Sequence, residues 1–191
     1  MKKNELEKLK EYSKALDNLA KNSSKDKFPN KDHKHAAIAL SKVLKYSNES
    51  FILFDDNLNG DVVKFNEVES FKKSLLDFIS RNGKVKIVIS DKNKKDNFEL
   101  KLFLEVVSEL YPNLVFIKIA SKKFKSEMRK IYNEKINFAI GDDNKYRLEK
   151  FGENHVDDKT RSAEGSFNNY DVVEELKNVF EYNFGNCENY F

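Results

Sequence analysis

Three short apolar runs constrain the fold of this chain more than any other feature of its sequence. They are "SFILFD" at 50–55, "KVKIVISD" at 84–91 and "LVFIKIA" at 114–120. Continuous apolar runs of this length are typical of strands buried on both faces of a sheet. Amphipathic segments separate them, so we expect the three runs to be adjacent parallel strands of one sheet.

Amphipathic helices are predicted before, between and after these runs. Their residue ranges are 33–47, 66–83, 97–113, 126–134 and 169–184. Two more strands, 135–142 and 145–151, are joined by an Asp-Asn turn and are expected to pair antiparallel. The alternation of helices and strands predicts an α/β domain with a mixed, mainly parallel sheet that is flanked by helices.

A helical arm is expected before this domain, over residues 3–21. Its apolar residues recur every three or four positions, at Leu6, Leu9, Tyr12, Leu16 and Leu19. Ser, Asn and Pro in "KNSSKDKFPNKD" then interrupt the pattern. We therefore divide the chain into an arm with its linker, residues 1–30, and an α/β domain, residues 31–191. The narrow apolar stripe predicts that the arm packs on the domain or on a partner.

Composition excludes several classes of protein. The chain of 191 residues is 39% hydrophobic, which is enough for a buried core. Its charges nearly cancel at +3, so they offer little support for a nucleic-acid surface, which requires basic residues gathered on one face. Cys187 is the single cysteine and is expected to be an inert thiol. No signal peptide or apolar segment of about 20 residues is present, so a cytoplasmic location is expected.

Two polar segments contain residue types that can bind a cation. His33 and His35 follow Asp32, but positions i and i+2 of a helix diverge by about 200°. This divergence favours a solvated helix start with Asp32 as the N-cap. "FDDNLNGD" at 54–61 follows a predicted strand, where α/β sheets bind ligands, and its aspartates could hold a cation; a polar turn is the favoured interpretation. Glycine-rich phosphate loops are absent from the sequence, and we expect no metal and no cofactor.

The region after the third run resembles a catalytic motif. "KINFAIGD" at 135–142 is followed by "GSFN" at 165–168. The phospholipase D-like superfamily carries His-x-Lys, four residues, Asp, and then Gly-Ser-x-Asn. The matching positions here are Asp142, Gly165, Ser166 and Asn168. The resemblance covers about residues 33–184 and implies one half of that family's fold.

Two departures from the motif predict that its chemistry is lost. With Asp142 aligned, Lys135 replaces the family histidine and Asn137 replaces the family lysine. In the family, the histidine attacks phosphorus and a second histidine, from another half or another subunit, protonates the leaving group. That nucleophile must be a neutral imidazole, whereas a lysine in ordinary surroundings is protonated at neutral pH. Asparagine also supplies no positive charge for the transition state. The resemblance therefore implies a catalytically degenerate site.

A histidine elsewhere offers an alternative. His155 lies between the two parts of the motif and would approach Asp142 and Ser166 if its segment folded back. A solvated loop histidine is the other interpretation.

A row of charged residues accompanies the motif. Lys145, Arg147 and Glu149 alternate along the last predicted strand and should face one side. Such a row is usually solvated, although it could contact an acidic or phosphate-bearing partner.

The sequence therefore predicts a degenerate phospholipase D-like domain that acts as a binding, regulatory or assembly module in a bacterial system. The candidate ligand-binding residues are Asn137, Arg147, Ser166 and Asn168. The alternative is a phosphodiesterase or nuclease whose non-standard site is built from Lys135, Asp142, His155, Ser166 and Asn168, or from a metal held by its aspartates. A third interpretation is an adaptor whose arm docks on another protein.

The expected partner is a protein or a second copy, with a nucleic acid or another phosphodiester ligand as a further option and no membrane. Single-motif members of the resembled family pair two halves to complete one site. We therefore expect a homodimer, which would also cover the apolar stripe of the arm, Leu6, Leu9, Leu16 and Leu19, in both copies.

Overall fold

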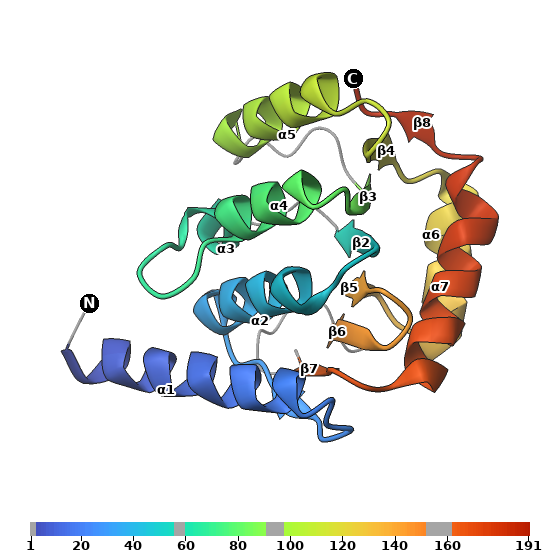
Figure 1. The fold of residues 1–191 in the computed structure, drawn as a ribbon. Helices are drawn as coiled ribbons and strands as arrows, with labels where there is room; N and C mark the ends of the chain where they lie inside the picture. Colours follow the sequence, from blue (N-terminus) through green and yellow to red (C-terminus); the bar gives the residue numbers. More distant parts are fainter. Residues whose placement is uncertain (1–2, 56–59, 91–97, 152–161) are drawn as a thin grey trace.

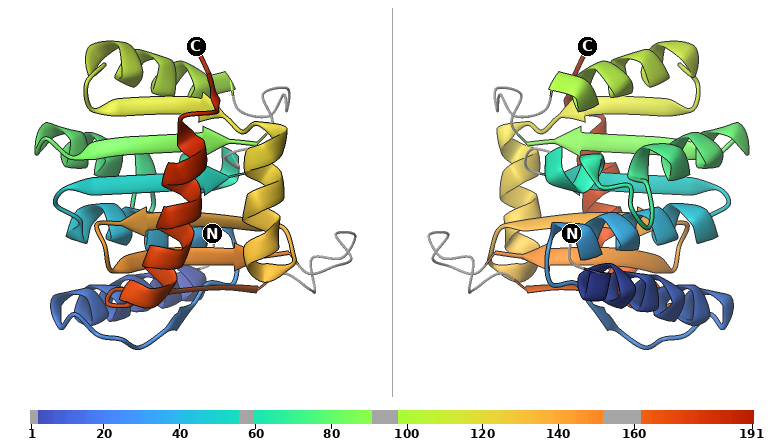
Figure 2. Two further views of the ribbon diagram at one scale, coloured as in Figure 1. Left: turned by 90° about the vertical axis from the view of Figure 1, so that its right-hand side faces the viewer. Right: turned by 90° about the vertical axis from the view of Figure 1, so that its left-hand side faces the viewer.

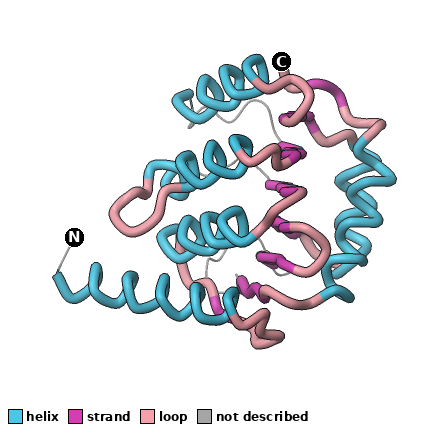
Figure 3. Tube along the Cα trace, in the orientation of Figure 1, coloured by secondary structure: helices cyan, strands magenta, loops and turns pink. Residues whose placement is uncertain are grey.

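The structure is a computed structural model that describes residues 3–55, 60–90, 98–151 and 162–191. Figure 1 shows one sheet seen edge-on, with a layer of helices on each side. Figure 3 shows the same three layers, with the strands between the two groups of helices. None of the helices in these ranges has both the length and the apolar character needed to traverse a bilayer.

The sheet has the strand order β1-β7-β6-β5-β2-β3-β4-β8. The strands are β1 (Phe28–Pro29), β2 (Ser50–Asp55), β3 (Lys84–Ile89), β4 (Val115–Ile119), β5 (Ile136–Gly141), β6 (Lys145–Lys150), β7 (Ser162–Ser166) and β8 (Glu188–Asn189). The three apolar runs form β2, β3 and β4, which are adjacent and parallel as predicted.

The predicted α/β fold with a mixed sheet is confirmed, with one correction. The sheet is not mainly parallel, because the other described pairings are all antiparallel. The expected hairpin of β5 and β6 accounts for one of them. Short chain reversals of this kind can join only antiparallel strands, whereas parallel strands need a long crossover.

Helices cover both faces of the sheet. They are α1 (Lys3–Lys21), α2 (His33–Tyr46), α3 (Gly60–Lys64), α4 (Phe71–Ser80), α5 (Phe98–Leu110), α6 (Lys122–Tyr132) and α7 (Tyr170–Phe184). Helices α1 to α5 lie on one side, and α6 and α7 lie on the other (Figures 1 and 2). Two starts differ from the predicted ranges because serine caps set them. Ser70 accepts a hydrogen bond from Lys73 N at the start of α4, and Ser121 accepts one from Phe124 N at the start of α6.

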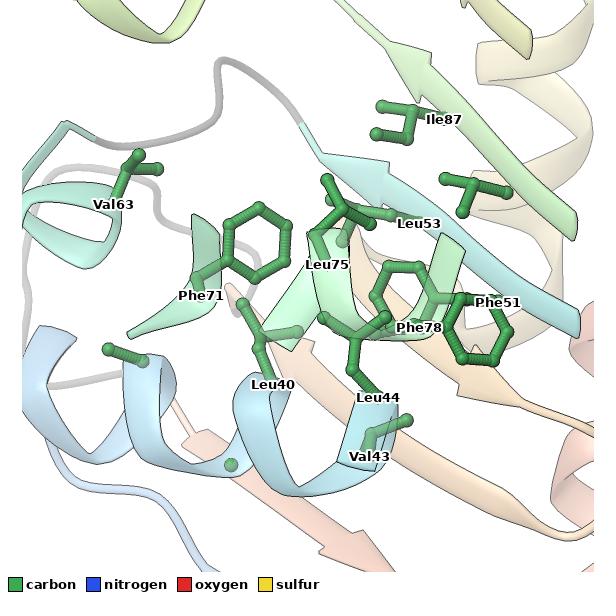
Figure 4. Packing of buried hydrophobic residues seen from close by; sticks show 14 of the residues in the cluster. Leu40, Val43, Leu44, Phe51, Leu53, Val63, Phe71, Leu75, Phe78 and Ile87 are labelled. Atoms are coloured by element: carbon green, nitrogen blue, oxygen red, sulfur yellow. The ribbon is translucent and has the colours of Figure 1, made fainter. Parts of the chain in front are cut away.

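Two hydrophobic clusters fill the spaces between these layers. The larger one contains Phe51 and Leu53 of β2 together with Leu44 of α2 and Phe78 of α4 (Figure 4). The second lies under α6 and α7 and includes Phe138. β2 therefore contributes alternate side chains to both clusters, which explains why its sequence is apolar without interruption.

The predicted arm is a helix that packs on its own domain. Leu9 and Leu16 of α1 are buried in the same cluster as α2. Tyr12 donates a hydrogen bond to the carbonyl of Pro29 in β1, and β1 pairs with β7 at the edge of the sheet. The centre of the stripe is thus covered by the chain's own domain, which is the first of the two predicted arrangements. A domain boundary at residue 30 stays a prediction.

A buried lysine fastens α1 to α2. Lys42 is 1% exposed, and its Nζ lies 2.8 Å from Asp17 Oδ2 and 2.5 Å from Glu69 Oε1. Asp17 also accepts hydrogen bonds from Lys45 and from the Tyr46 hydroxyl. Helix α1 is therefore held by a charged network as well as by its apolar stripe.

Candidate functional site

Three polar side chains share one face of the sheet where the aligned motif begins. Asn137 on β5 pairs with Glu149 on β6, and Ala139 pairs with Arg147. Cross-strand partners and alternate residues of a strand point to the same face, so Asn137, Arg147 and Glu149 project together. That face is the one covered by α1 and α2, because Ala139 belongs to the cluster that contains those helices.

Arg147 is tied into the fold. Its side chain is almost wholly buried, its Nε donates to Asn30 Oδ1 at 2.7 Å, and its Nη2 lies 3.5 Å from Glu149 Oε2. Asn137 Nδ2 donates to the same carboxylate oxygen at 3.5 Å. The expectation of a solvated row is therefore wrong for this row of residues. The linker residue Asn30 and the helices above it provide a cover that the strand's own sequence does not indicate.

Asp142 lies at the opposite end of β5 and serves as a clamp. Its carboxylate accepts hydrogen bonds from the backbone N–H groups of Asn48, Glu49 and Ser50 and from Lys145 Nζ at 3.1 Å. Burial by itself would raise the pKa of this carboxyl, but the Glu49 N–H and the Lys145 ammonium outweigh burial and hold the pKa below its usual range. Asp142 therefore stays ionised and joins the end of β5 to the start of β2.

Each residue of "GSFN" has a structural role. A Cβ on Gly165 would lie 2.3 Å from Phe28 Cζ, so the strand needs glycine there. Ser166 Oγ donates to the backbone carbonyls of residues 24 and 25 at 3.4–3.5 Å, and Asn168 Nδ2 donates to that of residue 23 at 2.8 Å. Phe167 is buried, and its ring centre is 5.2 Å from that of Phe28. This tetrapeptide binds the segment between α1 and β1.

The structure separates the two parts of the aligned motif. Ile136, which follows Lys135, pairs with Lys150, and Lys150 pairs with Ser162. Ser166 is four residues further along β7, which is about 13 Å along the strand direction. Lys135 and Asn137 therefore lie at one end of these strands, Asp142, Ser166 and Asn168 lie toward the other, and Arg147, which pairs with Ala139 and Gly165, lies between them. Lys135 is half-buried, with its ammonium 4.9 Å from the ring centre of Phe151.

Of the remaining candidate residues, Asp32 caps a helix, and others lie outside the described residues. Asp32 is the N-cap of α2 as expected and accepts hydrogen bonds from the backbone N–H groups of Lys34 and His35. His35 Nδ1 lies 2.8 Å from the same carboxylate. His155 and Asp56 lie outside the described residues. Within those ranges, no group of three or more His, Cys, Asp or Glu side chains is arranged to hold a metal ion.

A surface hollow of about 430 Å³ adjoins the Asp142 clamp. Its lining includes Lys84, Asp143 and Lys177, and Lys177 Nζ is 2.5 Å from Asp143 Oδ1. Side chains of both charge signs line the hollow, so it has no single charge preference.

Two important residues carried no signal in the sequence. Lys42 is one of many lysines on charged helices, and its burial follows only from the packing of α1 on α2. Asn30 lies in the predicted linker, 117 positions from its partner Arg147. Contacts of this range become visible only when the sheet is assembled.

The sequence has no match among protein-family models and none among curated proteins. Solved structures, by contrast, resemble the fold. The phospholipase D family member Nuc from Salmonella typhimurium has a TM-score of 0.50 and 12% identity, covering 86% of this chain and 95% of its own. NucT from Helicobacter pylori has a TM-score of 0.54 and 14% identity, covering 86% and 97%. At these identities the likeness concerns the fold alone, and the chain has the fold of the phospholipase D family.

A third similar structure belongs to TrmBL2, an archaeal chromatin protein whose structure shows a novel mode of DNA binding. Its TM-score is 0.58 at 15% identity, over 98% of this chain. This chain spans 65% of the length of TrmBL2. The similarity includes nearly all of the present chain, α1 among it.

Proposed function

We propose that this chain is a catalytically degenerate phospholipase D-like domain that acts as a binding, regulatory or assembly module in a bacterial system. The observation that supports the proposal is the bonding of Arg147 and Asn137, which lie on the same face of the sheet on neighbouring strands. The guanidinium of Arg147 is bonded to Asn30 and lies beside Glu149, and the Asn137 amide donates to that same Glu149 carboxylate. The polar groups of Arg147 and Asn137 therefore contact other side chains of the same protein and stabilise the fold.

The chemistry of the two aligned positions supports the same proposal. Lys135 has an amine in place of an imidazole, and Asn137 has an amide that neither attacks phosphorus nor carries charge. Catalysis through a covalent phosphohistidine needs an imidazole at the first position. The chain is therefore expected to bind its partner without hydrolysing it.

A phosphodiester-bearing partner is included in this proposal. TrmBL2, which shares the fold, is described as binding DNA. The candidate contacts are Asn137 at one end of the strands, Arg147 between the two ends, and Ser166 and Asn168 at the other end. Contact through Arg147 would require its bond to Asn30 to open, so we expect binding to be modest and strongly salt-dependent.

Fluorescence anisotropy of labelled single-stranded DNA with a chelator present tests this proposal. We expect binding that weakens between about 50 and 200 mM salt, with the DNA recovered intact. Arg147→Gln should weaken it, and Arg129→Gln on the exposed surface of α6 is the control with the same chemical change. DNA that is not bound would reject the phosphodiester partner and leave a protein partner. DNA that is bound and cut would contradict the lack of catalysis.

The second candidate is a phosphodiesterase or nuclease with a non-standard site. Its support is the likeness to Nuc and NucT over most of their length. Such a site would use His155 with groups near either strand end, but Lys135 and Ser166 lie apart in the sheet. Turnover that survives chelator and disappears in His155→Ala would favour this candidate.

A further inference from the structure

The N-terminal part of the chain lies across the candidate ligand-binding residues. We call residues 3–30 the strap; it contains α1, β1 and the residues that join them. Three backbone carbonyl groups of the strap accept hydrogen bonds from Ser166 and Asn168. Arg147 Nε donates to the side chain of Asn30, the last residue of the strap. Three of the four candidate ligand-binding residues therefore donate to the strap.

These hydrogen bonds share one direction. In each of them the donor belongs to the sheet or to the turn that follows β7, and the acceptor is an oxygen atom of the strap. The two shortest are 2.7 Å from Arg147 Nε and 2.8 Å from Asn168 Nδ2. A phosphodiester group presents acceptor oxygens to donors of the same types, arginine, serine and asparagine. The strap therefore competes with a phosphodiester for these donors.

The strap also keeps solvent away from the donors. Ser166 is fully buried, and Arg147 is 4% exposed. Helix α1 lies near the guanidinium, since burial raises the pKa of the Tyr12 hydroxyl and the Arg147 charge acts in the opposite direction. Tyr12 donates to the carbonyl of Pro29, so α1 and the end of the strap are joined beside Arg147. A ligand therefore reaches Arg147 and Ser166 only when the strap has moved.

The strap is anchored at two places and exposed between them. Leu16 of α1 is buried, and so is Phe28, whose ring centre is 5.2 Å from that of Phe167. Between these anchors, residues 25–27 are exposed, and Ser23 has a φ of 45°, in the left-handed region that residues with a side chain rarely adopt. At the edge of the sheet, two residues of the strap pair with β7. Parts of a protein with few buried contacts open at a lower free energy than its core.

We infer that the strap is an autoinhibitory element, which has to be displaced before a phosphodiester-bearing ligand binds beneath it. The inference names the regulation of the proposed site and rests on the proposed function. A ligand that binds only the open state has an apparent dissociation constant equal to its intrinsic constant divided by the open fraction. Changes that favour the docked strap therefore weaken binding, and changes that favour the displaced strap strengthen it.

A disulfide between β1 and β7 tests the inference in the full chain. Pro29 and Glu164 lie directly opposite each other on these neighbouring strands, at a separation that a disulfide can span. The native Cys187 is buried. The oxidised double variant Pro29→Cys/Glu164→Cys should bind labelled single-stranded DNA about tenfold or more weakly than the same protein after reduction. Fluorescence anisotropy measures both forms, and circular dichroism checks that both are folded. The reduced form is the control for the two substitutions.

A second test breaks one hydrogen bond from each of its two ends. Asn30→Ala removes the acceptor on the strap and leaves the Arg147 guanidinium for the ligand, so DNA binding should become about threefold tighter or more. Arg147→Gln removes the donor and should weaken binding. A contact with only a structural role would change both variants in the same direction. Asn22→Ala, at an exposed residue of the strap, is the matched control and should bind like the wild type.

The inference and the proposed function fail separately in these experiments. Equal binding by the oxidised and reduced forms, or weaker binding by Asn30→Ala, would overturn the autoinhibitory strap and leave the proposed binding role. DNA that is cut by the reduced protein and bound more weakly by the oxidised protein would reject the lack of catalysis and support the strap. If no form of the protein binds DNA, Asn30→Ala included, the inference is overturned and the proposed function keeps a protein partner.

Discussion

Replacing Lys42 with methionine tests the account of how α1 is held. The substitution keeps most of the side-chain volume and removes the ammonium that lies against Asp17 and Glu69. Removing one partner of a buried ion pair costs about 3–5 kcal/mol. Both carboxylates are about a quarter exposed, and Asp17 keeps Lys45 and Tyr46 as donors. We therefore expect a loss at the low end, about 3 kcal/mol, which lowers the melting temperature of a chain of this size by about 6–12 °C.

The pH dependence of this loss follows from Asp17. Burial alone would raise the pKa of its carboxyl, but hydrogen bonds from Lys42, Tyr46 and Lys45 lower it from 3.8 to about 2. A carboxyl whose folded pKa is depressed stabilises the fold above its unfolded pKa, and that stability is lost as the pH falls through the folded value. The shift corresponds to on the order of 2 kcal/mol. The difference between wild type and Lys42→Met should therefore shrink as the pH falls from 4 toward 2.

Urea unfolding followed by circular dichroism at pH 7 and pH 3 measures both effects. Lys45→Met is the matched control, because Lys45 pairs with the same Asp17 but is 51% exposed. An exposed pair contributes about 1 kcal/mol or less, so this variant should lose far less stability. The reasoning is refuted if Lys42→Met lies within about 0.5 kcal/mol of wild type at pH 7. It is also refuted if the difference is the same at both pH values.

Two further substitutions test the structural roles of the motif region. In Gly165→Ala the new Cβ would lie 2.3 Å from Phe28 Cζ and 2.5 Å from the Tyr146 carbonyl oxygen. We therefore expect the free energy of unfolding to fall by about 1–3 kcal/mol, measured by thermal unfolding. An unchanged melting temperature would mean that the fold accommodates a methyl group at this position of β7. Asp142→Asn keeps the shape of the clamp but removes its charge, and should cost about 1–2 kcal/mol at pH 7. Because the pKa of Asp142 is depressed, that cost should fall in acid, and urea unfolding that gives the same cost at pH 7 and pH 3 would count against an ionised clamp.

The central strands could be predicted because burial on both faces dictates their composition. The runs at 50–55, 84–91 and 114–120 have few polar residues, since a layer of helices covers each side of the sheet. β7, with the sequence "SAEGS", has no such pattern. It is a strand because β6 and β1 pair with it, and that information is not local.

The candidate site was less predictable, for a related reason. The string "GSFN" can be picked out of the sequence, but its hydrogen bonds go to residues 23–25, more than 140 positions away, and no local pattern predicts them. Alternation along the strand predicts a solvated Arg147, because it shows which residues share a face and not what covers that face. Asn30 and the two helices above the sheet provide that cover. Periodicity therefore predicts faces, and tertiary contacts decide what those faces do.

Hydrolysis of a generic phosphodiester tests the central claim most directly. The full chain is incubated with bis(p-nitrophenyl) phosphate in the presence of a chelator, at protein concentrations close to that of the substrate, so that even slow turnover is detected. We predict no release of nitrophenol above the protein-free blank, because the proposed alignment places Lys135 and Asn137 where the resembled family has its histidine and lysine. Release that survives the chelator and is lost in His155→Ala would contradict the account and identify a working site.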